Sequence, residues 1–177
     1  MGDAVAVGDG GLIRLRAGFG QAHLLDVSAA TYFYYCRPRA ASGSTINDVA
    51  TWDDVARIVG GLALTSEPSP HDWRVGKKLL AWERPLRPSD REALARSGVE
   101  PPSGDILGVR VSDEGVKFAL IADEPDIYFT TPHFDGYPAV LVRLAEASVR
   151  GLEELITEAW LTQAPKKLVQ EFLADSM

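Results

Sequence analysis

Basic and aromatic residues gather between positions 73 and 82 of the chain. Two tryptophans, Trp73 and Trp82, flank Arg74, Lys77 and Lys78 in this segment. If the segment folds as a hairpin of alternating strands, one side presents cations and rings together, which is the kind of surface that binds phosphates and bases. The alternative is that both tryptophans fill the core and the basic side chains are solvated, because Trp is first a large apolar residue.

Arg143 joins Arg74, Lys77, Lys78 and Trp82 as the residues that we predict for a nucleic-acid interface. It lies within an apolar run that is typical of a strand. We expect it on a sheet face beside an acidic partner, and the alternative is a clamp for an anion.

A loop rich in Pro and Gly, Thr131–Pro138, holds a second group of polar candidates: His133, Asp135 and Tyr137. A carboxylate beside a histidine can fix the imidazole tautomer for acid–base work. The simpler interpretation is a histidine whose hydrogen bonds shape the loop. The other two histidines of the chain show no metal-ligand spacing relative to it. We therefore predict no catalytic residue, no metal and no cofactor.

Composition narrows the function classes. The chain has 177 residues and a formal net charge of −7 at pH 7, so its long-range field repels phosphate backbones and a nucleic-acid role needs a local basic patch. The single cysteine, Cys36, cannot form an internal disulfide, and no thiol-enzyme motif surrounds it. No apolar run approaches the ~20 residues that span a membrane, and no secretory signal is evident. We expect a cytoplasmic protein.

The composition divides the chain into two parts. Residues 1–43 are rich in Gly and Ala and hold an aromatic cluster, Tyr32–Tyr35. We expect a poorly ordered extension there, and the alternative is a segment that docks on the main domain or on a neighbouring subunit. Residues 44–177 form the predicted domain.

Helical and strand patterns alternate along residues 44–177. Start signals predict helices after Thr51, after a serine cap at Ser89, after Ser148 and at Pro165. Alternation and turn residues predict strands and a hairpin around Gly115. The expected strands are Asp72–Val75, Lys78–Leu86, Ile106–Val111, Val116–Ala122, Ile127–Thr130 and Ala139–Ala145, with a loop at Thr65–Pro70. This pattern is α+β, a single antiparallel sheet backed by helices in two layers.

In their order, these segments resemble the MmcQ/YjbR-like family. The resemblance covers roughly Thr51 to Leu173. It rests on the opening helix, the Val75–Lys78 turn, the hairpin around Gly115, the Pro132–Tyr137 loop, the Val140–Leu144 strand and the helix that carries Trp160. It implies a compact domain of CyaY-like fold, in a family described as candidate DNA-binding proteins with a double-wing arrangement and no defined catalytic activity. Pro85–Gly104 and residues 1–50 depart from the family pattern.

We expect a non-enzymatic binding protein. Its first candidate ligand is DNA, bound by the basic and aromatic hairpin edge. The alternative is a protein-interaction or chaperone-like module, or a homodimer, which suits the acidic charge and uses the exposed sheet or the aromatic segment near the start of the chain. An enzyme centred on His133 is a third hypothesis, and it requires a second titrating group in a shared pocket.

Overall fold

The computed structural model describes residues 5–8, 11–14 and 49–175. The chain divides into two units, Met1–Arg37 and Pro38–Met177. In the first unit, strands β1 (Val5–Gly8) and β2 (Gly11–Arg14) pair as an antiparallel hairpin. The rest of the extension expected over residues 1–43, including its aromatic cluster, lies outside the described residues.

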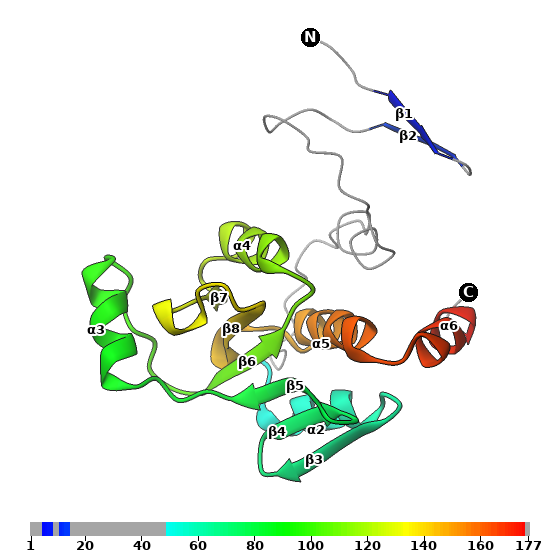
Figure 1. Ribbon diagram of the computed structural model, residues 1–177. Coiled ribbons are helices and arrows are strands. Elements are labelled where there is room, and N and C mark those ends of the chain that lie inside the picture. The colour runs from blue at the N-terminus through cyan, green and yellow to red at the C-terminus, as the bar shows by residue number, and fades with distance from the viewer. Residues whose placement is uncertain (1–4, 9–10, 15–48, 176–177) are drawn as a thin grey trace. The chain divides into compact units, whose positions relative to one another are not determined.

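The second unit is built on one six-stranded antiparallel sheet, which confirms the predicted fold class (Figure 1). The strands lie in the order β3-β4-β5-β6-β8-β7. Their bounds are β3 Thr65–Ser69, β4 Asp72–Val75, β5 Lys78–Glu83, β6 Ile106–Arg110, β7 Tyr128–Phe129 and β8 Ala139–Arg143. The register sets Trp82 opposite Gly108 and Arg110 opposite Ala139. Because directly opposed residues point to the same side, this register decides which side chains share a face.

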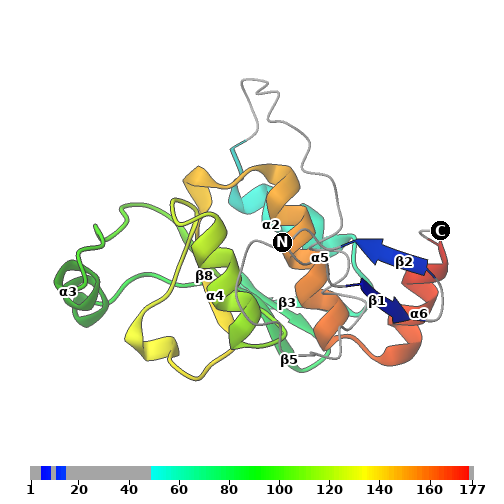
Figure 2. The same ribbon diagram turned by 90° about the horizontal axis from the view of Figure 1, so that it is seen from above.

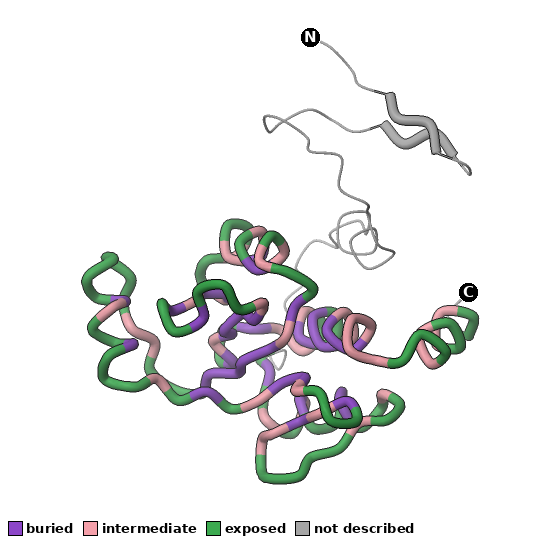
Figure 3. Tube along the Cα trace, viewed as in Figure 1, coloured by how far each residue is buried: buried purple, intermediate pink, exposed green. Residues whose placement is uncertain are grey.

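Three helices pack against one face of the sheet. They are α2 (Trp52–Gly60), α4 (Glu114–Asp123) and α5 (Val149–Gln163), and all three contribute to the main hydrophobic cluster. The predicted capping box at Thr51 is present, and the helix expected after Ser148 begins there. Its five predicted inward residues are all buried: Leu152, Leu155, Ile156, Ala159 and Trp160. Figure 3 shows burial concentrated along the central strands and α5.

The last helix packs less deeply than the others. α6 (Lys166–Asp175) follows Pro165, as expected. Its apolar residues are half-buried, and none is fully buried. Phe172 meets Trp160 with ring centroids 5.2 Å apart, so α6 is anchored to the core mainly through this pair of rings.

The opposite face of the sheet is covered at one end. A smaller hydrophobic cluster there joins Leu94 of α3 (Pro88–Arg96) and Phe134 of the turn η1 (Pro132–Phe134) to Phe129 and Leu141. In both views α3 stands apart from the helices of the other face (Figures 1 and 2). Over β4 and β5 this face carries a surface pocket.

α4 takes the place of a predicted strand. We expected Val116–Ala122 to return as a strand after a hairpin turn, and this prediction was wrong. Asp113 accepts a hydrogen bond from the backbone N–H of Val116 at 3.0 Å and starts the helix, while β6 pairs with β8 instead. Alternation in a short apolar segment does not distinguish a strand from a helix, and this explains the error.

Several other bounds also differ from the predicted ones, among them those of β7 and β8. The expected loop at Thr65–Pro70 contains the edge strand β3, which accommodates Pro68 because an edge strand has one unpaired side. β5 ends at Glu83 rather than at Leu86. α3 begins at Pro88 without the predicted serine cap, because the carboxylate of Asp90 accepts from the backbone N–H of Arg87 at 3.0 Å.

A buried lysine ties α4 to the loop that precedes β8. The side chain of Lys117 is fully buried. Its Nζ donates to Glu114 Oε1 at 2.8 Å and to the backbone oxygens of Phe134 and Tyr137 at 3.0 and 3.2 Å. The bond from Lys117, and then one from the backbone N–H of Gly136, lower the pKa of the Glu114 carboxyl. All three donors of the ammonium group therefore have acceptors, which is the condition for burying a charge.

Replacing this lysine should cost much of the stability of the domain. We expect Lys117→Met to lower the free energy of unfolding by about 2–3 kcal/mol, because two carbonyl groups lose their donor at a buried position. Urea unfolding measures the change. Lys167→Met is the control: Lys167 and Glu171 form an exposed pair at 3.8 Å, so the loss there should stay below about 0.5 kcal/mol. If Lys117→Met were as stable as the wild type, the hydrogen bonds of Lys117 would not stabilise the domain.

Glu158 on α5 introduces a pH dependence. Burial, and then the charge of Glu154, raises the pKa of this half-buried carboxyl to about 7. A raised pKa means that the folded protein holds the proton more strongly than the unfolded chain does. Stability therefore falls as the pH rises from the ordinary value of 4.5 towards 7, and the full cost is present above that range.

Removing the charge of Glu158 should stabilise the domain at alkaline pH only. We expect Glu158→Gln to raise the free energy of unfolding by about 1 kcal/mol near pH 8, after allowance for the partial exposure of the group. Near the ordinary carboxyl pKa the two proteins should unfold alike, because Glu158 is protonated there. Thermal unfolding at both pH values tests this, with the exposed neighbour Glu153→Gln as control. A gain that is the same at both pH values would rule out the titration of Glu158.

Candidate functional site

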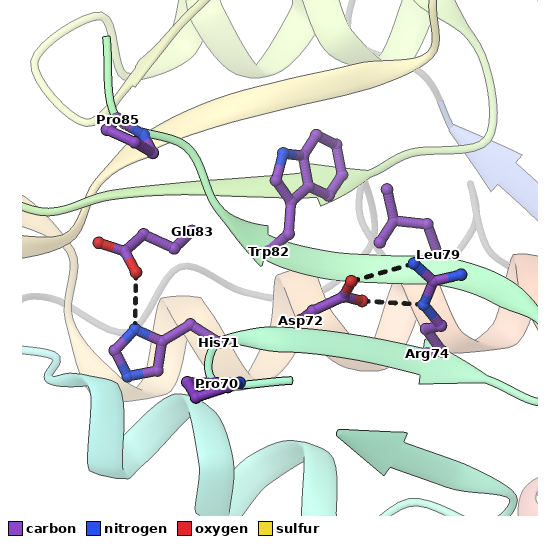
Figure 4. Close-up of a pocket in the computed structure, with 8 residues that line it drawn as sticks. All are labelled: Pro70, His71, Asp72, Arg74, Leu79, Trp82, Glu83 and Pro85. Carbon is purple, nitrogen blue, oxygen red and sulfur yellow. Dashed lines mark hydrogen bonds and ion pairs between the residues drawn. The ribbon is translucent and has the colours of Figure 1, made fainter. Parts of the chain in front are cut away.

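The open side of the β4–β5 hairpin carries a pocket of about 380 Å³ (Figure 4). The register sets Asp72 opposite Trp82 and Arg74 opposite Leu79 on this side, whereas Trp73 points into the main core. Arg74 and Trp82 are thus the two predicted interface residues that the pocket brings together. Its lining residues are Pro70, His71, Asp72, Arg74, Leu79, Trp82, Glu83 and Pro85.

Trp82 keeps its position because the residue opposite has no side chain. A Cβ atom at Gly108 would lie 2.6 Å from Cε2 and 2.7 Å from Cζ2 of the indole. Such distances are far inside van der Waals contact, so the ring occupies the space that any other residue would fill. Gly108 thus allows Trp82 to lie against β6 instead of standing away from the sheet.

One ion pair and one contact between a histidine and a carboxylate join the polar side chains of the pocket. Arg74 donates from Nε and Nη2 to the two oxygens of Asp72 at 2.9 and 3.0 Å. Hydrogen bonding to Asp72, and then its charge, raises the pKa of Arg74. Nδ1 of His71 lies 3.0 Å from Oε2 of Glu83. The predicted cation Arg74 is therefore largely offset by a neighbouring carboxylate.

His71 is the pocket residue that sequence reasoning missed. Its ring stacks on Trp52 at 4.3 Å, with an interplanar angle of 15°. Its backbone has a φ of 57°, and its N–H donates to Glu67 at 2.8 Å. The Ser-Pro-His turn between β3 and β4 gave a signal for a turn, but nothing in it indicated that the histidine would meet Glu83 twelve residues later.

A row of rings leads from the pocket to an arginine. The ring centroids of Trp82 and Phe134 are 6.1 Å apart, and those of Phe134 and Tyr137 are also 6.1 Å apart. Cζ of Arg110 lies 4.3 Å from the centroid of the Tyr137 ring, which is within cation–π range. We call Trp82, Phe134, Tyr137 and Arg110 the aromatic row. Tyr137 was predicted as a residue of interest, and Arg110 was not.

Arg110 has no acidic partner among the described residues. Its Nη1 is buried without a hydrogen-bond partner. By contrast, Arg84 beneath the row pairs with Asp90 at 2.8 Å, and Arg74 pairs with Asp72. A guanidinium stays protonated at any physiological pH. Arg110 is therefore a positive charge that stacks on Tyr137, with one nitrogen covered and no carboxylate among the described residues to compete with an anion.

The buried pair beneath Phe134 stabilises this end of the sheet. Burial acts to raise the pKa of Asp90, but hydrogen bonds from the Arg87 backbone and from Arg84, with the charges of Arg84 and His133, bring it below its usual value. Cζ of Arg84 lies 5.4 Å from the centroid of the Phe134 ring. Phe134 therefore packs against an ion pair whose two charges cancel.

The remaining predicted cations lie elsewhere on the unit. Lys77 is exposed at the turn between β4 and β5. Nζ of Lys78 donates to the backbone oxygen of Gln163 at the end of α5, at 3.0 Å. Arg143 donates to the backbone oxygens of Pro125 and Asp126 at 3.0 and 3.2 Å rather than to a carboxylate. The five predicted residues therefore do not form one continuous surface.

The predicted His133 loop does not form a dyad. His133 is exposed in η1 and meets Phe134 edge to face, with ring centroids 5.0 Å apart. Asp135 is also exposed, and within the part of the chain that the structure describes no hydrogen bond joins it to His133. The charge of His133 acts on Asp90 instead. Of the three residues predicted in this loop, Tyr137 belongs to the aromatic row.

Residues 5–8, 11–14 and 49–175 contain neither a candidate metal cluster nor a helix that could span a membrane. No group of three or more His, Cys, Asp or Glu side chains is arranged to hold a metal ion there. In the same residues, the helices are too short or too polar to cross a membrane.

Three curated proteins are close relatives of the chain. It is 84% identical over 128 residues to Uncharacterized protein Rv2570 of Mycobacterium tuberculosis strain H37Rv, to Uncharacterized protein MT2646 of a second strain of that species, and to Uncharacterized protein Mb2600 of Mycobacterium bovis. Each match covers 72% of this chain and 99% of the relative. No family model matches the chain, and no solved structure matches it.

The contact between Trp82 and Gly108 can be tested by adding one methyl group. We expect Gly108→Ala to lower the free energy of unfolding by about 1–3 kcal/mol, because the indole must move off the sheet. Gly60→Ala is the control, since nothing lies within 4 Å of a Cβ there and alanine favours the helix by about 0.5–1 kcal/mol. Urea unfolding, with the indole N–H signal of Trp82 in NMR spectra, measures both effects. An unshifted Trp82 signal in Gly108→Ala would contradict this packing.

Proposed function

Since this chain belongs to one family with these three mycobacterial proteins, we propose a function from its own site: a non-enzymatic, cytoplasmic protein that binds DNA. The binding surface is the aromatic row together with the adjoining pocket, and the exposed turn at Lys77 lies at the end of the same hairpin. The proposal agrees with the resemblance to the MmcQ/YjbR-like family, which stays a prediction.

Arg110 is the observation that carries the proposal. It is a guanidinium without an acidic partner among the described residues, stacked at 4.3 Å on a tyrosine that is 41% exposed. Stacking fixes its direction before any ligand arrives, so little conformational entropy is lost on binding. An arginine beside exposed rings supports contacts to a phosphate and to bases at once.

The negative charge of the chain is unevenly distributed, which matters because a net charge of −7 disfavours DNA binding. The strands of the sheet hold four basic and three acidic residues. Helices α2, α4 and α5, which pack on the other face, hold three basic and seven acidic residues. Much of the negative surplus therefore belongs to the helical layer, and screening by salt limits its reach to about 10 Å.

The pocket supports a binding role better than a catalytic one. Its carboxylates, Asp72 and Glu83, are each engaged by a neighbouring basic side chain. A general acid or base must exchange a proton with the substrate from within hydrogen-bond reach. Groups that are already paired in this way favour recognition over proton transfer.

A protein partner is the second candidate, and the same carboxylates favour it. Asp72 and Glu83 lie beside Trp82 in the pocket, a combination that suits a basic side chain stacked on an indole. The net charge of −7 also attracts basic surfaces. The negative charge of Asp72 disfavours DNA and favours a basic partner. Removing that charge should therefore affect the two kinds of binding in opposite directions.

The test measures how DNA binding responds to Arg110. The probe is a fluorescent DNA hairpin with a single-stranded tail, titrated at low salt and followed by anisotropy. We expect Arg110→Ala to weaken binding about tenfold, since one phosphate contact is lost. The slope of the logarithm of affinity against the logarithm of salt concentration should become shallower by about one. Arg150→Ala removes the same charge from α5, where Arg150 pairs with Glu154 at 3.3 Å, and should leave binding unchanged.

Asp72→Asn should act in the opposite direction on DNA. It releases Arg74 and removes a negative charge, so the affinity for the probe should rise. A wild-type protein that does not bind the probe at micromolar concentration would remove the DNA proposal and leave the protein-partner candidate. Equal losses in Arg110→Ala and Arg150→Ala would show that binding, if present, does not use the aromatic row.

A further inference from the structure

We infer that the aromatic row binds single-stranded nucleic acid in preference to a duplex, with bases on Trp82 and Tyr137 and a phosphate at Arg110. This inference rests on the proposed function and specifies its ligand. It depends on which faces of the rings are accessible and on where the charges lie along the row.

The accessible rings lie close enough together for one strand to reach both. Tyr137 is 41% exposed, and Trp82 lines the open pocket. Between them, Phe134 is buried and acts as a spacer, at 6.1 Å from each ring. The two accessible rings are therefore no farther apart than these two steps together. A flexible single strand can place a base on each ring, because every base has a face that stacks.

A duplex cannot use this surface in the same way. In a duplex the faces of the bases are covered by their neighbours, and only their edges are open in the grooves. Reading those edges requires an element that enters a groove, such as a helix or a two-stranded ribbon. Trp82 lies against Gly108 on the sheet, and Arg110 is partly buried with its Nη1 covered. Neither side chain projects far enough to reach into a groove.

The charges give the row a direction. At the pocket end, Arg74 is offset by Asp72 and attracts a phosphate only weakly, while the oxygens of Asp72 and Glu83 can accept hydrogen bonds from base amino groups. At the other end, Arg110 attracts a phosphate without competition from an acidic partner in the described residues. A strand bound along the row therefore places a base over the pocket and its backbone near Arg110.

The experiment compares four probes with the full-length protein. They are single-stranded DNA, single-stranded RNA, duplex DNA and duplex RNA of the same sequence, each of about 15 nucleotides, near the upper end of known single-strand site sizes. Anisotropy titrations at one low salt concentration give the four affinities. We expect at least one single strand to bind about tenfold more tightly than its duplex, which corresponds to one stacked base. Whether DNA or RNA is the tighter single strand identifies the natural source.

Variants of Tyr137 separate stacking from charge. Tyr137→Phe keeps the ring and should keep the preference for single strands. Tyr137→Leu keeps the bulk but removes the π face, and should lower single-strand affinity about fivefold or more while it changes duplex affinity little. Circular dichroism confirms that both variants fold, and a variant that does not fold is replaced by Tyr137→Met.

The possible results distinguish the preference for single strands from DNA binding itself. A duplex bound as tightly as the single strand, or equal single-strand affinity of Tyr137→Phe and Tyr137→Leu, overturns the inference while DNA binding stands. No binding of any probe at micromolar protein overturns both. A single-strand preference that depends on the ring supports both.

Discussion

The candidate surface depends on one buried charge, the ammonium group of Lys117. Its three hydrogen bonds reach Glu114 and two backbone oxygens of the loop before β8. Glu114 in turn holds the backbone N–H of Gly136. A loop that carries Phe134 and Tyr137 is thereby attached to a helix of the main core. Because a buried ammonium group must keep all its acceptors, the loop cannot move without a large cost, and the two rings stay where they meet Trp82 and Arg110.

The sheet separates this surface from the helical layer. Residues that alternate along β5 and β6 send Ala81, Leu107 and Val109 to the main cluster, while Trp82 and Arg110 lie on the other face. The first set is packed under α2, α4 and α5, and the second is left partly open. The same alternation that stabilises the core therefore produces the row, and a register shift of one residue would exchange the two sets.

Sequence reasoning reached the architecture but only part of the surface. Local signals were sufficient for α2 and α5, because Thr51 and Ser148 cap their own helices. They failed at Val116–Ala122, where a cap at Asp113 and the pairing of β6 with β8 decide the structure. Trp82 was singled out beside basic residues of a predicted hairpin, with burial in the core as the alternative, and Tyr137 was singled out in a loop rich in Pro and Gly. Arg110 looked like any strand residue, because its partner Tyr137 is 27 positions away and its lack of an acid is a tertiary property.

The contrast between Arg110 and the other arginines explains why an unpaired charge is informative. Arg84, Arg74 and Arg57 each meet a carboxylate, and Arg143 meets two carbonyl groups. A partly desolvated guanidinium that lacks such a partner weakens the fold, since its lost hydration is not fully replaced. The stacking on Tyr137 compensates for only part of that loss. An anionic ligand at the open part of the guanidinium would offset the charge of Arg110, so the group that weakens the free protein would strengthen the complex. Stability and recognition thus oppose each other at Arg110, as they commonly do at functional sites.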